Sequence, residues 1–514
     1  MNSFIFSPVV VSVKTVFTRY LPIAALILSI VSSLTATANT SVSENAATDV
    51  NDIASDTESD TKSDVEWSDA AVSHHIDADN YKGILDHEQL KELAQAGSEL
   101  FSARFTVVDG VGRPLATQAI IPTKRKRPPR SEFARTAGLD ANACVSCHNQ
   151  PVAGGAGDFS VNVFVSEGFQ LSDFDSTDPQ FSNERNTNHL FGAGLVELLA
   201  REMTADLHNI RRMALSDARS QGEMVKASLV TKGISFGQVT AFADGRIDTS
   251  DFEGVDDDLI VKPFSQKGVM TSLRQFTVNA LNHHHGMQAN ERFGERWTGT
   301  SDFDEDGVTS EMTAGDVSAL VAYQANLPPP SHRKVSDNWA QASAHGSQLF
   351  DQLGCNQCHV RALPLNSLSF IDPGPYDAAG TLRSGESGRD AVYDLSQLAW
   401  AESLERNDKG QWMVPLFGDL KRHVIADTQV ARLGNELLSQ RFVERNEFMT
   451  AELWGIGSTD PYGHRGDIST LGEVIAAHGG EARESRDLYL KLSDTDRSAI
   501  NAFLKMMIIE PSVQ

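Results

Sequence analysis

The sequence predicts a mainly α-helical protein with long irregular loops and little strand, built from two similar halves. Three observations favour this fold class. Apolar residues recur at helical spacing in several stretches, most clearly at 195–215 and 272–288. All four cysteines lie in two pentapeptides, Cys-Val-Ser-Cys-His at 144–148 and Cys-Asn-Gln-Cys-His at 355–359. A proline-rich stretch between them, LPPPSHRK at 327–334, cannot continue the helix that precedes it.

The N-terminus has the features of a secretory signal. Lys14 and Arg19 precede an apolar run at 21–34, and the sequence Ala-Thr-Ala at 36–38 provides a cleavage site. An uncleaved membrane anchor is the alternative, because residues 20–38 are nearly long enough to span a bilayer. We expect residues 1–38 to be removed and the soluble body, which has no other apolar run of spanning length, to be periplasmic.

Composition limits the partners of the exported chain. Residues 39–64 are acidic, rich in Ser and Thr and free of aromatics, which predicts a disordered tether. The whole chain has a formal net charge of −25. This charge argues against nucleic acid and anionic membranes as partners, and it is compatible with a cationic protein partner.

The proline-rich stretch divides the body into an N-terminal domain, 65–330, and a C-terminal domain, 331–514. Each domain contains one cysteine pentapeptide. The helical pattern just before the boundary contains Val317, Leu320, Val321 and Tyr323.

Cys-x-x-Cys-His is the attachment signature of c-type haem. Two cysteine sulfurs form thioethers to the porphyrin, and the adjacent histidine supplies a ligand to the iron. The sequence therefore predicts two covalently bound haem groups. The first is held by Cys144, Cys147 and His148, and the second by Cys355, Cys358 and His359. A zinc site and a pair of disulfides are the alternatives, but neither requires a histidine after both cysteine pairs.

The second pentapeptide has the surroundings of a small cytochrome c. A helical pattern at 338–354 leads into it, and the chain closes with another at 492–507. Ser493 and Asp496 can cap this last helix. Its apolar side chains, Ile500, Phe503, Leu504 and Met507, make one stripe.

The sequence resembles the bacterial di-haem cytochrome c peroxidases and the related di-haem oxidoreductases, a group that also includes the methylamine-utilisation di-haem enzyme and the rubber oxygenases. It is most similar to the poorly characterised di-haem oxidoreductases. The resemblance covers about residues 88 to 508 and implies two cytochrome c-like domains, often with calcium between them. The matching stretches are NACVSCHNQPVAGGAG, RNTNHLFGAGLVELLA, QLFDQLGCNQCHV, VPLFGDLKRH and FMTAELWGIGSTDPYGHRGDISTLGEVIAAHGGEA.

The resemblance implies that the first haem reacts and that the second relays electrons. No histidine or methionine lies between His148 and His189, which favours an open position on the first iron unless His189 occupies it. His478 stands where the peroxidases carry the methionine ligand of the second haem. His464 is the competing ligand.

The acid–base residues of the peroxidases are not in their usual places. By resemblance, Gly286 and Phe276 occupy the positions of the family's Glu and Gln. Three histidines beside this vacancy, His283, His284 and His285, are candidates for proton transfer, and Glu197 is another. A solvated histidine run and a helix-surface carboxylate contacting Arg201 are the alternatives. Trp454 and Trp297 are candidates for the path between the haems.

Two charged segments suggest further sites. Asp302, Asp304 and Asp306 alternate before Gly307, and Glu311 follows, which is typical of a variant calcium loop or of a solvated acidic turn. The basic run TKRKRPPR at 123–130 is a candidate for contacts with haem propionates or with an electron donor.

These observations predict a periplasmic di-haem oxidoreductase of the peroxidase type. It would reduce hydrogen peroxide with electrons from a small cytochrome c or a cupredoxin, relayed through the second haem. The alternatives are an oxygenase or oxidase that acts on an organic substrate, favoured by the missing Glu and Gln, and a non-enzymatic electron carrier.

Overall fold

The computed structural model describes residues 68–112, 142–158, 160–165, 182–378, 380–388, 390–436 and 442–510. These residues belong to one compact unit, Ser63–Gln514. The predicted signal at 1–38, the predicted tether at 39–64 and the basic run at 123–130 lie outside the described residues. In the part of the chain that is described, no helix is long and apolar enough to cross a membrane.

The helices expected from the sequence are present. The stretch at 195–215 lies within a longer helix, whereas the helix expected at 272–288 ends at Ala280 and continues as a π-helical turn, Leu281–His285. The α-helices are α1 (His87–Ser102), α2 (Ala193–Gln221), α3 (Leu273–Ala280), α4 (Asn290–Phe293), α5 (Glu295–Thr298), α6 (Ala314–Asn326), α7 (Asp337–Gln352), α8 (Leu471–Ala476), α9 (Arg483–Leu490) and α10 (Asp494–Leu504).

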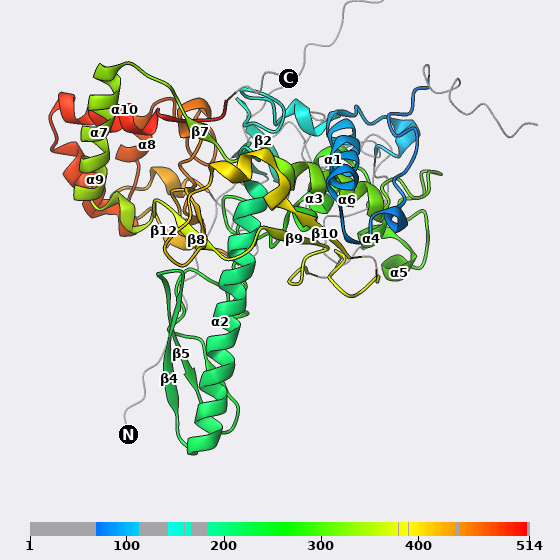
Figure 1. The fold of residues 1–514 in the computed structure, drawn as a ribbon, viewed down its shortest axis with the longest axis horizontal. Coiled ribbons are helices and arrows are strands. Elements are labelled where there is room, and N and C mark those ends of the chain that lie inside the picture. Colours follow the sequence, from blue (N-terminus) through cyan, green and yellow to red (C-terminus); the bar gives the residue numbers. More distant parts are fainter. Residues whose placement is uncertain are drawn as a thin grey trace, which may run out of the picture. The chain divides into compact units, whose positions relative to one another are not determined.

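Two helix pairs each have a glycine where the helices cross. Helix α1 packs against α6, and α7 packs against α10 (Figure 1). A Cβ atom on Gly97 would lie 1.9 Å from the carbonyl oxygen of Ala319, and one on Gly346 would lie 1.9 Å from that of Ala499. Because glycine has no side chain, the two backbones of each pair come into direct contact. Each pair therefore depends on one glycine at the crossing.

The ends of these helices follow local capping rules. The Ser493 hydroxyl accepts a hydrogen bond from the backbone N–H of Asp496, which confirms the cap expected for α10. Helix α1 begins with a capping box at Asp86, and α6 begins with one at Thr313. The expected apolar stripe of the final segment is buried.

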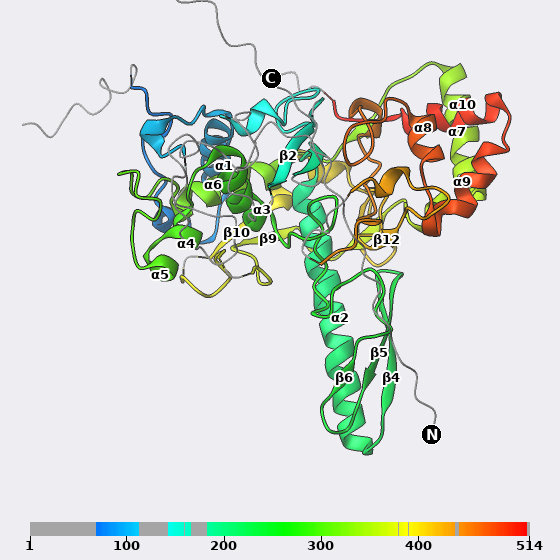
Figure 2. The same cartoon turned by 180° about the vertical axis from the view of Figure 1, so that it is seen from behind.

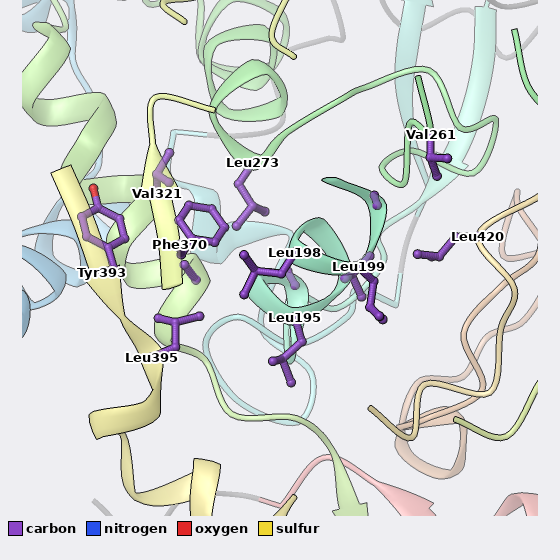
Figure 3. Packing of buried hydrophobic residues seen from close by; sticks show 14 of the residues in the cluster. Leu195, Leu198, Leu199, Val261, Leu273, Val321, Phe370, Tyr393, Leu395 and Leu420 are labelled. Carbon is purple, nitrogen blue, oxygen red and sulfur yellow. The ribbon is translucent and has the colours of Figure 1, made fainter. Parts of the chain in front are cut away.

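Helix α2 connects the core to a separate sheet. Its first half is buried, and Figure 3 shows Leu195, Leu198 and Leu199 packed near Leu273. Its second half lies beside strands β4 and β5 (Figure 2). The helix ends at Gly222, a C-cap in the left-handed conformation.

The expectation of a mainly α-helical fold with little strand is wrong. Within the described residues, the strands form two three-stranded and four two-stranded sheets, ordered β1-β10-β9, β4-β5-β6, β11-β8, β12-β13, β14-β7 and β2-β3. The strands are β1 (Gly83–Ile84), β2 (Ser160–Val165), β3 (Ser182–Asn186), β4 (Val225–Thr231), β5 (Ile234–Ala241), β6 (Ile247–Asp248), β7 (Ser331–His332), β8 (Leu363–Leu365), β9 (Ser369–Asp372), β10 (Ala391–Asp394), β11 (Trp412–Val414), β12 (Arg422–Val424), β13 (Glu447–Met449) and β14 (Met507–Ile508).

The longest strands that were not predicted from the sequence form the β4–β5 hairpin. Its strands are joined by Lys232 and Gly233, whose φ angles are 51° and 86°. Two consecutive left-handed residues are typical of a type I′ turn, which matches the twist of a hairpin. Most other strands have only two to four residues, too few to show a two-residue period.

The hydrophobic core has two main clusters. One joins α1, α2, α3 and α6 to residues of 363–420, including Phe370 and Tyr393. The other joins α7 and α10 to residues of 417–489, including Tyr462 and Leu471. The domain boundary at 330/331 stays a prediction.

Candidate functional site

A cavity of about 910 Å³ is lined by both cysteine pentapeptides. The six residues expected to attach and ligate haem all contribute to its wall: Cys144, Cys147, His148, Cys355, Cys358 and His359. Helix α3, the loop 185–191 and the segment 448–464 also line it. The two predicted attachment points therefore open into one continuous space.

Each pentapeptide folds as a tight turn. Cys144–Ser146 and Cys355–Gln357 are single 3-10 turns, in contact with α1 and α7 respectively. The backbone N–H of His148 donates to the Cys144 carbonyl at 3.1 Å, and that of His359 donates to Cys355 at 3.0 Å. This turn keeps both cysteines and the following histidine at the cavity wall.

The two histidines of the pentapeptides make matching hydrogen bonds. Nδ1 of His148 lies 3.3 Å from the Gly155 carbonyl oxygen, and Nδ1 of His359 lies 3.3 Å from that of Phe417. Because a carbonyl only accepts, each Nδ1 donates and each Nε2 is left as the acceptor. Metal-ligating histidines are typically oriented in this way. Burial lowers the pKa of both imidazoles to about 4, so both are neutral, as iron ligation requires.

The sulfur atoms also fit thioether attachment. All four cysteines are free thiols, and burial raises the pKa of Cys144 to about 12 and that of Cys355 to about 11. Among the described residues, no cluster with metal-ligand spacing contains two cysteines, which argues against a zinc site. Two free thiols and one Nδ1-bonded histidine at each end of the cavity fit one haem at each end.

Of the two candidates for the second axial ligand, His478 lies beside His359. It lines the cavity, and after burial its proximity is the largest cause of the lowered pKa of His359. Nδ1 of His478 is 2.7 Å from the Val474 carbonyl oxygen, which leaves Nε2 as the acceptor. His464 also lines the cavity, but its Nε2 is 3.4 Å from Glu436 Oε1 and its ring packs on Phe448.

His189 and Trp454 meet at the cavity wall. Nε2 of His189 lies 3.0 Å from the Trp454 carbonyl oxygen. Burial lowers the pKa of His189 to about 4, so the imidazole is neutral. The indole of Trp454 packs against Gly192, where a Cβ atom would lie 2.5 Å from the ring. Trp297 is 40 % exposed on α5 and does not line the cavity.

The three consecutive histidines occupy the π-helical turn at the end of α3. His283, His284 and His285 all line the cavity. Nε2 of His285 is 3.5 Å from the Cys144 sulfur, whereas Nδ1 of His284 is buried and makes no hydrogen bond to the described part of the chain. Burial lowers the pKa of His284 to about 3, which keeps this imidazole neutral. Such turns occur often at functional sites, and this one brings all three rings to one wall.

The other positions considered for proton transfer lie differently. Phe276 lines the cavity, and Gly286 does not. Glu197 is also absent from the cavity wall. It is buried in α2, is paired with Arg201 at 2.5 Å and accepts a hydrogen bond from the backbone N–H of Leu273. The contact with Arg201 expected at i+4 is present, but the pair is buried and not on the helix surface.

Two residues near the second pentapeptide were missed in the sequence. Glu452 lines the cavity, and burial raises its pKa to about 7. His423 lies between Asp419 and Glu481, with 2.8 Å contacts on both ring nitrogens, and 4.0 Å from Cys358 Sγ. Although burial opposes it, the hydrogen bond to Asp419 helps to raise the pKa of His423 to about 11. Neither residue belongs to a spaced motif that could identify it.

The predicted calcium loop brings three carboxylates together. Oxygen atoms of Asp302, Asp304 and Asp306 lie within 4.8 Å of one another. Glu311 is outside this group but near it. Burial, and then the charge of Asp304, raises its pKa well above the usual range. Its carboxylate accepts a hydrogen bond from the backbone N–H of Gln288 at 2.6 Å.

The comparison with protein families identifies the C-terminal part of the chain. Residues 403–507 match the family described as "Di-haem oxidoreductase, putative peroxidase". Over this stretch the chain is similar to the di-haem oxidoreductase family. The matched stretch contains Glu452, Trp454, His464 and His478, and the resemblance found in the sequence is confirmed. The family implies a di-haem redox enzyme.

Solved structures give weaker similarity. The chain is 13 % identical to hydrazine synthase of Kuenenia stuttgartiensis, with 82 % of this chain and 95 % of that chain covered and a TM-score of 0.31. It is also 13 % identical to a MauG-like protein associated with microbial copper homeostasis, with 60 % and 89 % covered and a TM-score of 0.26. No curated protein matches the sequence.

Proposed function

We propose that the chain is an exported di-haem c oxidoreductase of the peroxidase type, which reduces hydrogen peroxide with electrons from a small redox protein. One observation carries the proposal. Both Cys-x-x-Cys-His turns open into the same cavity, each with a neutral, Nδ1-bonded histidine. This arrangement supports two redox groups that exchange electrons without crossing bulk solvent.

The residues would hold the two groups in equivalent ways. Cys144 and Cys147 would form the thioethers of the first haem, and His148 would ligate its iron through Nε2. The second haem would be held by Cys355, Cys358 and His359, with His478 as the second axial ligand. When bound, the second haem would relay electrons from the donor protein to the first haem, and the first haem would reduce peroxide.

The net reaction sets what the protein side chains must do. Hydrogen peroxide, two electrons and two protons give two molecules of water, as one O–O bond breaks and two O–H bonds form. The donor protein supplies the electrons one at a time. The chain must therefore take a proton from one peroxide oxygen and return protons to the oxygens that leave as water.

His283 and His284 are the residues best placed for this proton transfer. Both line the cavity on the same turn, and His284 is neutral and keeps an Nδ1 without a hydrogen bond. A neutral imidazole can accept a proton and then return it. His285 is a weaker candidate, because its Nε2 lies against the Cys144 sulfur.

Steady-state oxidation of a reduced small cytochrome c by hydrogen peroxide tests the proposal. The haem-loaded protein should turn over. His284→Gln or His283→Gln should lower the rate by about 10²–10⁴-fold, the usual effect of losing a general acid–base group. His208→Gln is the matched control, because His208 is half-buried on α2 and lies outside the cavity wall. A haem-loaded wild-type protein that does not turn over peroxide would contradict the peroxidase function.

A second function is favoured by one observation. Phe276 lines the cavity where the peroxidases carry Gln, so this wall is less polar than theirs. An apolar wall suits an organic substrate that reacts with dioxygen. Consumption of dioxygen with an apolar substrate, and none of peroxide with the reduced donor, would favour this oxygenase or oxidase. An electron carrier would instead have two six-coordinate irons at rest.

The location and partners follow from the sequence. We propose that the protein is periplasmic, because residues 1–38 have the features of a secretory signal. A cationic small cytochrome c or cupredoxin suits the net charge of −25. Fractionation of cells that express the full chain should recover the haem-stained protein outside the cytoplasm.

A further inference from the structure

A cluster of buried charged residues forms part of the cavity wall on the side of the first pentapeptide. We call Arg185, Lys267, Glu436 and His464 the Arg185 cluster. All four side chains are at least 92 % buried, and they come from four distant segments of the chain. Arg185 and His464 line the cavity.

Arg185 is only partly satisfied within the cluster. Its Nη1 lies 2.5 Å from Glu436 Oε1 and donates to the Glu184 carbonyl oxygen at 2.9 Å. Its Nη2 is buried and donates no hydrogen bond to any residue that the structure describes. A guanidinium normally uses both of its terminal nitrogens when it is buried, so this arm lacks an acceptor.

Lys267 is the second cation. Its side chain is fully buried, and Nζ donates to the carbonyl oxygens of Glu444, Arg445 and Glu447 at 2.8 to 3.0 Å. Nζ also lies 3.4 Å from Glu436 Oε2 and 3.5 Å from the centre of the Phe448 ring. Glu436 is therefore shared between two cations.

The charges of the cluster do not balance. Arg185 and Lys267 are two cations beside the single carboxylate of Glu436, and burial lowers the pKa of Lys267 to about 8, which still leaves it charged near pH 7. The next carboxylate, Glu447, is paired with Arg422. Burial, and then the charges of Arg185 and Lys267, lower the pKa of His464 to about 2, so its ring is neutral, and its Nε2 also lacks a hydrogen bond. The neighbouring Arg465 is paired with Glu184 and adds no net charge. A buried positive charge is costly unless an anion compensates it.

Arg185 lies close to the first haem position. The loop after Arg185 is hydrogen-bonded to the segment that holds the His148 ring, because the Gly157 N–H donates to the Thr187 carbonyl at 3.2 Å and the Leu190 N–H donates to the Gly154 carbonyl at 2.8 Å. Arg185, Asn188 and His148 line the same cavity. A carboxylate at this wall would satisfy Nη2 of Arg185 and balance the cluster, and guanidinium binds carboxylate well because the two groups are planar and complementary.

We propose that Arg185 binds a carboxylate in the cavity, and that this carboxylate is a propionate of the haem attached at Cys144 and Cys147. The inference rests on the proposed haem attachment. A free carboxylate ligand that enters the cavity has the same chemistry and is the other source. The positive charge of Arg185 disfavours the more positive, oxidised iron. Without that charge, the midpoint potential of the first haem should therefore fall.

Potentiometric titration of the full-length haem-loaded protein, followed by visible absorption, tests the proposal. Arg185→Gln should lower the midpoint potential of the first haem and leave that of the second unchanged. Arg185→Lys keeps the charge and the pairing with Glu436, so its potential should lie closer to wild type. The matched control is Arg465→Gln, which makes the same change of charge next to His464 but outside the cavity. Circular dichroism establishes that each variant is folded.

A second experiment titrates acetate into the haem-loaded protein, as a probe for a free carboxylate ligand. A saturable change in the absorption of the first haem in wild type, lost in Arg185→Gln without any shift of potential, would assign the site to a free carboxylate and exclude the propionate. Unchanged potentials in Arg185→Gln together with no response to acetate would overturn the proposal. A protein without covalently bound haem would instead refute the proposed function, which separates the two failures.

Discussion

At the scale of single residues, the choice of the second axial ligand depends on what else holds each histidine. His478 is fixed through Nδ1 and has its Nε2 available near His359. The ring of His464 packs on Phe448, and its Nε2 points toward the Arg185 cluster, 3.4 Å from Glu436 Oε1. Both are histidines in glycine-containing loops of the same family stretch, so the sequence alone could not separate them by their local pattern.

His478→Ala should therefore remove one low-spin iron signal from the resting spectrum, because the second haem would lose its axial nitrogen. The measurement is electron paramagnetic resonance of the haem-loaded protein at low temperature. His464→Ala serves as the comparison and should retain that signal. Loss of the signal in His464→Ala, with His478→Ala unchanged, would reverse the assignment.

The protonation of His75 gives a second prediction at this scale. Nδ1 of His75 lies 2.7 Å from a carboxylate oxygen of Asp316, which is buried at the start of α6. The hydrogen bond to Asp316 raises the pKa of His75 above 6.5. The raised pKa means that this contact stabilises the fold fully below pH 6.5, and that the stabilisation is lost as the pH rises through the folded-state value.

His75→Gln should lower the urea midpoint of unfolding at pH 5.5 and change it much less at pH 9. The exposed neighbour gives the control, since His74→Gln should have little effect at either pH. An equal loss at both pH values would show that the charge of His75 does not matter.

At the scale of elements, the two glycine crossings make the helix pairs comparable. A Cβ atom at either glycine would meet a backbone carbonyl oxygen, which cannot rotate away. Gly97→Ala and Gly346→Ala should each destabilise the protein by about 1–3 kcal/mol, as overpacking of a close contact does.

Chemical denaturation of each variant measures this effect. Gly472→Ala in α8 is the control, because its new Cβ would meet only the end of the Tyr489 side chain at 3.3 Å. A gain in stability for Gly97→Ala or Gly346→Ala, as expected from helix propensity alone, would contradict the account of the crossings.

The acidic loop 302–311 yields a further prediction for one element. If the three converging aspartates bind calcium, excess calcium should raise the midpoint of thermal unfolding and a chelator should lower it. Asp304→Asn should remove this difference, because Asp304 is the buried member of the group. Identical midpoints with calcium and with chelator in wild type would show that the loop is a solvated acidic turn.

Sequence patterns predicted the elements whose signals are local. The helices expected at 338–354 and 492–507, around the second pentapeptide, have helical periods of three or four turns, and they are present as α7 and α10. The π-helical turn was not predictable, because its register depends on how Leu281–His285 packs at the cavity. The short strands could not be predicted for a similar reason. Strands β1 and β7 form only through pairing with β10 and β14, which are distant in the sequence.

At the scale of the whole molecule, the site combines local motifs with long-range contacts. Both Cys-x-x-Cys-His turns could be found in the sequence, because attachment and ligation use adjacent residues. The Arg185 cluster could not, because it joins residues from positions 185 to 464 and only the folded chain shows its unequal charges. Glu197 illustrates the reverse case, a carboxylate that resembled a catalytic group and lies outside the cavity wall.

The central claim is that each of the two pentapeptides carries a covalently attached haem. Mass spectrometry of the intact chain tests it most directly, after expression with the export signal and extraction with acidified organic solvent. The account predicts a polypeptide heavier than its processed sequence by two haem groups. In Cys355→Ala/Cys358→Ala the added mass should fall to one haem. A wild-type chain that has only its sequence mass and four reactive thiols would contradict the claim.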